Sequence, residues 1–251
     1  MTRLELDRSA PVFYVEHSPS TNAQLKDMAR QGAQEGTVLL ADRQTQGRGR
    51  LGRSFASPEG GVYMSMLLRP DVSAQRIPEL SACAALAARR AILRCCDVEA
   101  GIKWPNDLLL ENKKVCGILS EAVISGAEIA VILGLGVNLN TPLSAFPGEL
   151  RGIASSLSAI TGKSYDRLEF VRCLTEELDN VYSRWKTGEK FAAEYRAACL
   201  SLERQVTVIR EEARFEAYAF DILEDMSLMV RLSDGREENI RYGEASVRGL
   251  Y

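Results

Sequence analysis

The spacing of apolar residues predicts alternating strands and helices in the first part of the chain. Short apolar runs bounded by polar residues, glycine or proline predict strands at residues 12–16, 37–42 and 61–70. Residues 20–32 predict a helix, which a capping box at Thr21 and Gln24 would begin and Gly32 would end. Residues 77–96 are rich in alanine and leucine and therefore predict a long, largely buried helix.

The pattern continues to residue 200 and then changes to short strands. Apolar strands are expected at residues 102–110, 115–124 and 127–140. A stripe at three- and four-residue spacing predicts an amphipathic helix with Val171, Leu174, Leu178, Val181 and Trp185, and residues 190–200 predict another helix. The four or five short strands that follow are typical of a small antiparallel barrel. We therefore expect an α/β or α+β domain over residues 1–200 and a β-barrel over 201–251.

Composition indicates a globular protein of the cytoplasm. Hydrophobic residues make up 46% of the chain and charged residues 26%. No apolar run is long enough to predict a membrane span, and residues 1–16 lack the apolar segment and cleavage site of a secretory signal.

The cysteines and the single histidine exclude several kinds of chemistry. The six cysteines form no CxxC pair and most have apolar neighbours, so we expect reduced, buried thiols rather than disulfides or a zinc site. They are Cys83, Cys95, Cys96, Cys116, Cys173 and Cys199. Any Ser–His or Cys–His nucleophile would have to use His17. Its place at the end of an apolar run instead favours an exposed strand-end residue.

The basic residues are unevenly spread. The net charge of −3 argues against a general nucleic-acid-binding protein. However, Arg43, Arg48, Arg50 and Arg53 lie in a stretch without an acid, which indicates a local anion site. In GRGRLGR (47–53), glycines let backbone N–H groups approach an anion, and arginines add forked donors. A disordered basic loop or an RNA-binding segment is the alternative.

Three further motifs are each ambiguous alone. KWPND (103–107) is either a polar cluster beside the core or an ordinary strand-end turn. Lys114 precedes a glycine-containing strand, a position that a solvated hairpin lysine also occupies. GLGVNLN (134–140) lacks the third glycine and the following helix of a dinucleotide-binding loop, so we exclude that interpretation. Glycines within a strand instead indicate close approach of a ligand or another backbone.

Taken in order, the motifs resemble the successive signatures of biotin–protein ligases. They are STN (20–22), GRGRLGR, KWPND, K-x-x-GIL (114–119), G-x-G-x-N-x-N (134–140) and G-x-x-S-V-R-G (243–249). The resemblance spans nearly the whole chain, and KWPND combined with GRGR is highly specific. It implies an α+β fold of the class II aminoacyl-tRNA synthetase type, in which a mixed sheet is backed by helices and followed by an SH3-like β-barrel.

The resemblance also implies a reaction. Biotin is joined to AMP with release of pyrophosphate, and biotin then passes to a lysine of a biotin carboxyl carrier protein; ATP and Mg²⁺ are required. Two like charges 4 Å apart repel by about 4 kcal/mol at an effective dielectric constant near 20. A carboxylate that meets a triphosphate therefore needs fixed cations around the reacting oxygens. We expect no direct metal site on the protein, since Mg²⁺ would arrive with ATP.

Matching residue by residue, the resemblance implies three overlapping sets. The catalytic set is Arg50, Lys103, Asp107 and Lys114, in which Asp107 orients the acceptor amine and takes up its proton. The biotin-binding set is Ser20, Thr21, Asn22, Gln44, Gly47, Arg48, Gly49, Arg50, Lys114, Gly117, Gly134 and Gly136. The ATP- or adenylate-binding set is Arg48, Arg50, Arg53, Lys103, Trp104, Asn106, Lys114 and Asn138.

The chain departs from the family pattern at two loop positions. Leu51 stands where the family commonly has arginine, and Phe55 where tryptophan is frequent. No tryptophan in the segment directly after Asn140 matches the family's adenine-stacking residue, and Phe146 is the aromatic residue considered in its place. We expect the GRGRLGR loop to be mobile without ligand and to close over it, because ordering a glycine-rich segment is entropically costly.

Two alternatives remain. A lipoate or octanoate ligase shares the fold and the acyl-transfer logic, although the polar STN and Gln44 set favours biotin over a fatty acid. A non-catalytic nucleic-acid-binding module would show strongly salt-dependent binding of oligonucleotides. About 19 residues precede STN, too few for a helix-turn-helix domain, so we expect no sequence-specific DNA binding. A homodimer through an exposed sheet edge is possible.

Overall fold

The structure, a computed structural model, describes residues 1–125, 128–210, 213–241, 244–247 and 250. An eight-stranded sheet in the order β1-β2-β3-β4-β8-β7-β6-β5 forms its centre. The strands are β1 (Thr2–Leu4), β2 (Val12–Ser18), β3 (Val38–Gln44), β4 (Val62–Leu68), β5 (Gly101–Lys103), β6 (Asp107–Leu110), β7 (Lys113–Ser125) and β8 (Glu128–Val137). Only β2 and β3 are parallel among the neighbouring pairs of this sheet described here. The predicted α+β class with a mixed sheet is confirmed.

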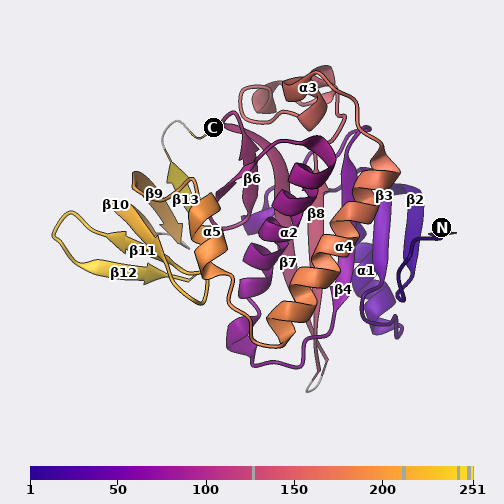
Figure 1. Cartoon of the computed structure of the whole chain (residues 1–251), viewed down its shortest axis with the longest axis horizontal. Helices are drawn as coiled ribbons and strands as arrows, with labels where there is room; N and C mark the ends of the chain where they lie inside the picture. Colours follow the sequence, from indigo (N-terminus) through magenta and orange to yellow (C-terminus); the bar gives the residue numbers. More distant parts are fainter. Residues whose placement is uncertain (126–127, 211–212, 242–243, 248–249, 251) are drawn as a thin grey trace.

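Helices cover both faces of this sheet (Figure 1). They are α1 (Thr21–Arg30), α2 (Glu79–Cys96), α3 (Leu157–Thr161), α4 (Arg167–Lys186) and α5 (Ala192–Ala198). Helices α2 and α4 lie side by side over one face, whereas α1 covers the other. Because side chains alternate along a strand, Leu39 and Leu67 pack with Leu25 of α1, and Leu40 and Met66 belong to the larger core on the opposite face.

The predicted helices over residues 20–32, 77–96 and 190–200 and the apolar stripe correspond to α1, α2, α5 and α4. The predicted capping residue of α1 was wrong. The N-cap is Ser20, whose hydroxyl accepts from the backbone N–H of Ala23, rather than Thr21. Gln24 instead accepts a hydrogen bond from the Ser18 hydroxyl at 2.6 Å. Gly32 follows the helix with φ +89°, as expected for a helix-ending glycine.

The predicted continuous strand over residues 102–110 is an antiparallel hairpin. Strands β5 and β6 pair with Lys103 opposite Asp107, and the turn between them contains the cis peptide bond Trp104–Pro105. Tertiary contacts hold this turn: the Tyr195 hydroxyl donates to the Pro105 carbonyl at 2.9 Å. The turn interpretation of KWPND is therefore correct for the backbone, and it places Asp107 at the start of β6.

The C-terminal strands form a second, open sheet in the order β12-β11-β10-β9-β13. They are β9 (Arg204–Arg210), β10 (Ala213–Ile222), β11 (Leu228–Arg231), β12 (Glu237–Ile240) and β13 (Glu244–Val247). The expected closed barrel is not confirmed, because β12 and β13 do not pair with each other in the described part of the chain. Gly243, Arg248 and Gly249 of the predicted C-terminal signature lie outside the described residues.

Hydrogen bonds join the two sheets at the Trp104 turn. The buried Trp104 indole donates to the Met226 carbonyl at 3.0 Å, and its backbone N–H donates to the Ser201 hydroxyl at 3.1 Å. The Leu200 N–H donates to the Ile102 carbonyl at 2.8 Å. The second sheet is thereby fixed against the turn that carries Asn106 and Asp107.

The cysteines and His17 lie as expected. All six thiols are free, and five of the six residues are buried, Cys95 being partly exposed. His17 is the second-to-last residue of β2. Its side chain is 45% exposed and contacts Arg43. Among the described helices, none has the length and apolar character needed to cross a membrane.

We predict that the buried thiols react slowly in the folded protein. Burial raises the pKa of Cys83 and Cys96 to about 12 and that of Cys199 to about 11, so these groups stay protonated at pH 8. Alkylation by iodoacetamide at pH 8 should be more than about 100-fold slower than in urea, because only the thiolate reacts. Mass spectrometry of digested samples measures this, and alkylation of Cys83 at the unfolded rate would contradict it.

Candidate active site

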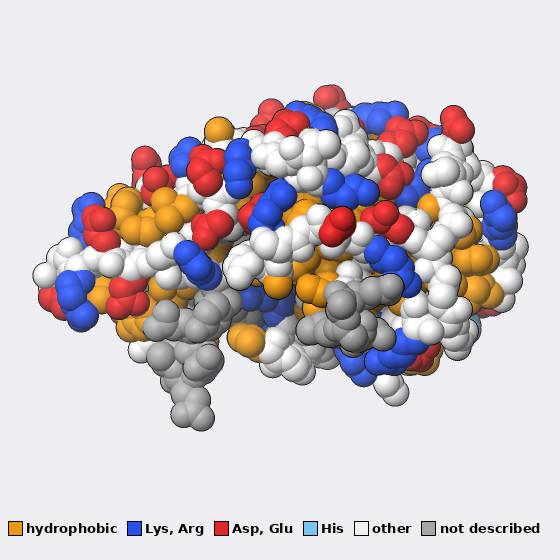
Figure 2. Space-filling model, turned by 90° about the horizontal axis from the view of Figure 1, so that it is seen from below, with side chains coloured by type: hydrophobic (Ala, Val, Ile, Leu, Met, Phe, Trp, Pro, Cys, Tyr) orange, Lys and Arg blue, Asp and Glu red, His pale blue; other side chains and the backbone are white. Residues whose placement is uncertain are grey.

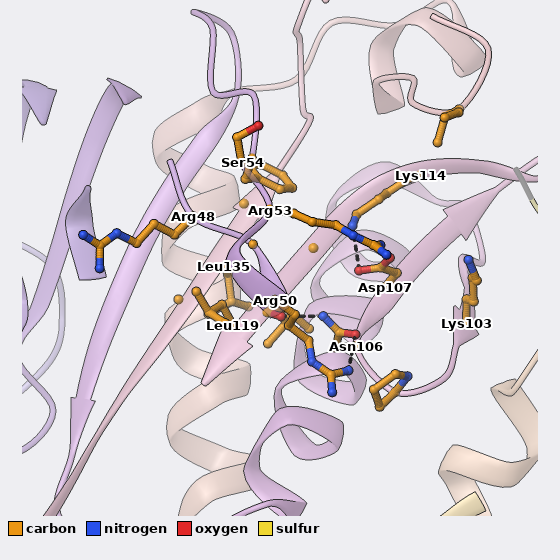
Figure 3. Close-up of a pocket in the computed structure, with 18 of the residues that line it drawn as sticks. Arg48, Arg50, Arg53, Ser54, Lys103, Asn106, Asp107, Lys114, Leu119 and Leu135 are labelled. Carbon is orange, nitrogen blue, oxygen red and sulfur yellow. Dashed lines mark hydrogen bonds and ion pairs between the residues drawn. The ribbon is translucent and has the colours of Figure 1, made fainter. Parts of the chain in front are cut away.

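A cavity of about 400 Å³ lies beside the N-terminal end of α1 (Figure 3). Strands β7 and β8 form its floor, and the loop from residue 45 to 57 and the turn at 104–106 form its sides. Strands β9 and β13 of the second sheet also contribute to its lining. Segments that are far apart in the sequence therefore meet at one site.

Side chains of the protein itself fill the space above the glycines of the floor. A Cβ atom on Gly136 would lie 2.3 Å from the Phe55 ring, and one on Gly117 would lie 2.8 Å from it. A Cβ atom on Gly134 would lie 2.1 Å from Oδ1 of Asn22. The sequence predicted close approach of a ligand or another backbone to these glycines, whereas the groups that lie on them in the structure are the side chains of Phe55 and Asn22.

The polar residues of the STN segment are divided between the cavity and its support. Ser20, Asn22 and Gln44 line the cavity, whereas Thr21 lies behind it. Both the backbone N–H and the hydroxyl of Thr21 donate to Oε1 of Gln44, at 2.8 and 3.1 Å. The Gln44 amide then donates to the Ser57 hydroxyl at 2.8 Å. Thr21 therefore orients a residue of the lining.

The GRGRLGR segment folds as a small hairpin over the cavity. The N–H of Gly49 donates to the Arg53 carbonyl at 2.8 Å, and that of Phe55 donates to the Gly47 carbonyl at 2.9 Å. Gly47 lies outside the lining, but a Cβ atom there would be 2.3 Å from the Phe55 carbonyl oxygen. The tip residue Leu51 has φ +53° and is 61% exposed.

Cationic side chains gather at the end of the cavity away from α1. Lys114 Nζ lies 2.8 Å from Oδ1 of Asp107, and Figure 3 shows Arg53 directed toward this pair. Arg50 Nη1 donates to Oδ1 of Asn106 at 3.1 Å. Arg48 lines the cavity but points away from Asn106 and Asp107 in Figure 3. Lys103 lines it as well and is 8% exposed.

Asn106 is held firmly. Its side-chain Nδ2 donates to the Ile118 carbonyl at 2.6 Å, and its backbone carbonyl accepts from the Ile118 N–H at 3.1 Å. These bonds leave Oδ1 as the acceptor for Arg50, so one side chain connects the floor of the cavity to the arginine loop. Within the described residues, no group of three His, Cys, Asp or Glu side chains could hold a metal ion.

Two of the predicted adenylate-binding residues use their side chains elsewhere. Asn138 is 2% exposed, is not part of the lining, and donates to the Lys114 and Ser155 carbonyls at 3.3 and 3.0 Å. It thereby ties the segment around Ser155 to β7. Trp104 does line the cavity, but its indole N–H is bound to Met226. Phe146 is buried and lies outside the lining.

Sequence reasoning missed several lining residues. They are Ser54, Phe55, Pro105, Ile118, Leu119, Leu135, Leu150, Ile153, Ile209, Ala245 and Ser246. Leu150 and Ile153 come from the segment before α3, where an aromatic residue had been sought for the adenine. Most of the others are apolar strand or turn residues, which carry no local signal of function. Phe55, two residues after the arginine motif, had been noted as a departure from the family pattern but had not been assigned to the site.

A partly buried carboxylate borders the α1 end of the cavity. Glu121 accepts from Nδ2 of Asn22 at 2.7 Å and lies 2.5 Å from Nζ of Lys26. Burial alone would raise the pKa of Glu121, but the hydrogen bonds from Lys26 and Asn22 and the charges of Lys26 and Arg48 outweigh it, so the pKa is lowered. Glu121 is therefore ionised at neutral pH.

Residues 12–138 match the model of the Biotin/lipoate A/B protein ligase family. The chain belongs to this family. A relative from Mycobacterium tuberculosis, the biotin–[acetyl-CoA-carboxylase] ligase, is 35% identical over 201 residues, which cover 77% of this chain and 73% of the relative. The bifunctional ligase/repressor BirA of Bacillus subtilis is 42% identical over 178 residues, 70% of this chain. The chain spans only 55% of that relative's length.

The fold is also similar to that of solved structures. The biotin protein ligase from Aquifex aeolicus in complex with biotin and ATP aligns with a TM-score of 0.81 and 30% identity. The alignment covers 94% of this chain and 98% of the Aquifex chain.

We predict that the Phe55 ring can keep its position only if residue 136 has no side chain. A Gly136→Ala exchange should lower the free energy of unfolding by about 1–3 kcal/mol, because the new methyl group displaces the ring. Thermal unfolding measures the change. Gly148→Ala is the matched control, since nothing lies within 4 Å of a Cβ atom there. The cost of Gly136→Ala should shrink in a Phe55→Ala background, and an unchanged cost would refute the contact.

Proposed function

We propose that the protein is a biotin–protein ligase that forms biotinyl-5′-AMP and transfers biotin to a carrier lysine. The observation that carries this proposal is one cavity with a polar end and a cationic end. Ser20, Asn22 and Gln44 lie at the first end, and the pair Lys114–Asp107 lies at the second. A bicyclic urea needs donors and acceptors, and a carboxylate beside a triphosphate needs cations.

In the first half-reaction, the biotin carboxylate oxygen bonds to the α-phosphorus of ATP and the bond to pyrophosphate breaks. Arg50, Lys103 and Lys114 stabilise the charge that accumulates on the phosphate oxygens. Asn106 holds Arg50 in place through its Oδ1. Mg²⁺ would come with ATP, because Asp107 is the only carboxylate in the described lining and the ion usually keeps phosphate and water ligands.

In the second half-reaction, the acceptor amine bonds to the acyl carbon and AMP leaves. Asp107 orients the amine and receives its proton. The ion pair with Lys114 keeps this carboxylate at the cavity until the adenylate phosphate offers the lysine another partner. The Phe55 ring packs on the floor against Gly117 and Gly136 and supplies an apolar surface for the ligand chain.

The acceptor we propose is the biotin-accepting domain of a carboxylase, in line with the name of the Mycobacterium relative. Residues 1–200 would form the catalytic domain and residues 201–251 a small SH3-like domain whose strands close one side of the site. Nucleic acid is a poor alternative ligand, since acidic and basic side chains are interspersed on the face shown in Figure 2. The proposal includes activity in the cytoplasm and a homodimer.

ATP–pyrophosphate exchange tests the substrate. Purified protein with biotin should exchange label, whereas lipoate, octanoate or no acid should give background rates, because the end formed by Ser20, Asn22 and Gln44 is polar. Exchange with lipoate or octanoate alone would show that the enzyme has a different substrate within its family. Absence of exchange with every acid, from folded protein, would refute ligase activity.

Asp107→Asn should separate the two half-reactions. Pyrophosphate exchange should persist, whereas transfer to the carrier should fall by about 100-fold or more, because the amide cannot accept the proton. Transfer is followed by mass spectrometry of the biotinylated carrier domain. Asp27→Asn, on the exposed face of α1, is the control. Equal loss in both half-reactions, or normal transfer, would contradict the role of Asp107.

A further inference from the structure

Glu121 on β7 is outside the lining of the main cavity, yet it contacts a residue inside it. One carboxylate oxygen accepts from Nδ2 of Asn22 at 2.7 Å, and the other lies 2.5 Å from Nζ of Lys26. The side chains of Glu121 and Lys26 are 23% and 20% exposed. The carboxylate is thus part of a partly buried arrangement between β7 and α1.

Asn22 lines the cavity and is held by several neighbours. It is 5% exposed, and its Oδ1 accepts from the Ser65 hydroxyl at 2.5 Å. Its Nδ2 also faces the Leu119 carbonyl at 3.4 Å. Its Oδ1 lies so close to Gly134 that any residue with a Cβ atom at position 134 would clash with it. The position of the side chain is therefore set by packing, but packing alone does not distinguish its oxygen from its nitrogen.

The neighbouring charges make that distinction. An ionised carboxylate and a backbone carbonyl can only accept hydrogen bonds, so the NH₂ group of Asn22 must face Glu121 and Leu119. Its oxygen then lies over Gly134, which also lines the cavity. An amide oxygen has two lone pairs, of which Ser65 uses one. The second is available to a donor in the cavity.

We propose that Glu121 is a positioning residue that fixes Asn22 with its oxygen toward the ligand, so that the site selects an acid carrying an N–H group at this end. This rests on the proposed function: the ureido ring of biotin has such N–H groups, whereas the dithiolane ring of lipoate and the chain of octanoate have none. Glu121 thereby determines specificity without touching the ligand.

Glu121→Gln tests the proposal, because a glutamine of the same shape can donate to Asn22 and lets its amide turn over. The Kd for biotin, from calorimetry without ATP, and the KM for biotin in exchange should both rise about tenfold, as expected for one lost hydrogen bond. The KM for ATP should stay unchanged. Selectivity for biotin over lipoate should fall by a similar factor.

Two further variants separate positioning from structural support. Lys26→Met removes the ion pair but leaves the contact from Glu121 to Asn22, so it should lower the Tm at least as much as Glu121→Gln while keeping the biotin KM. Glu121→Asp keeps an acceptor-only group and should stay nearer to the unaltered protein in selectivity. All assays are run at pH 8, where the carboxylate is ionised, and circular dichroism checks that each variant is folded.

An unchanged biotin Kd in folded Glu121→Gln would overturn the proposal. So would equal weakening of biotin and ATP, or a rise in biotin KM in Lys26→Met as large as that in Glu121→Gln. If Glu121→Gln does not fold, a clear loss of selectivity for biotin over lipoate in folded Lys26→Met would overturn it as well, because that variant keeps the contact from Glu121 to Asn22. An unaltered protein that neither binds biotin nor supports exchange would refute the proposed function itself, which distinguishes the two failures.

Discussion

The site depends on bare backbone in the two central strands β7 and β8. Gly117, Gly134 and Gly136 remove the side chains that would otherwise stand on this face of the sheet. The Phe55 ring and the Asn22 amide can therefore lie directly on the strands and fill space that a Cβ atom would occupy. The arginine loop and the start of α1 both acquire their positions from this contact, and with them the two ends of the cavity.

The sequence was sufficient for the main helices, for most of the central strands and for the polar and charged part of the cavity lining, but not for the hairpin of β5 and β6 or for the open second sheet. Apolar periodicity located the helices and central strands, because an amphipathic segment with one buried face has apolar residues at regular intervals. The motifs on the loop, the hairpin turn and β8 did converge on one cavity, as the resemblance implied. The group that packs on each glycine could not be predicted from the sequence. Gly136 and Phe55, for example, are far apart in the chain and meet only in the folded protein.

Residues that act through a neighbour left no local signal. Glu121 resembles any charged residue on a strand, and only the fold shows that its carboxylate meets Asn22. The resemblance assigned Trp104 to the adenylate site, and Trp104 does line the cavity, but only the fold shows that its indole N–H donates to the Met226 carbonyl between β10 and β11. The turn after Lys103 is likewise held by Tyr195, which is remote in sequence. Such roles are set by tertiary contacts, which composition and spacing do not record.

The Trp104 junction has a thermodynamic consequence. Its indole, its backbone N–H and the neighbouring Ile102 carbonyl all bond to the segment after α5 or to the second sheet. Melting of that sheet together with the segment after α5 would leave these groups without partners at the edge of a large core, which is unfavourable. The two sheets are therefore coupled into one cooperative unit, and a half-folded chain with an intact Trp104 turn is a state of high free energy.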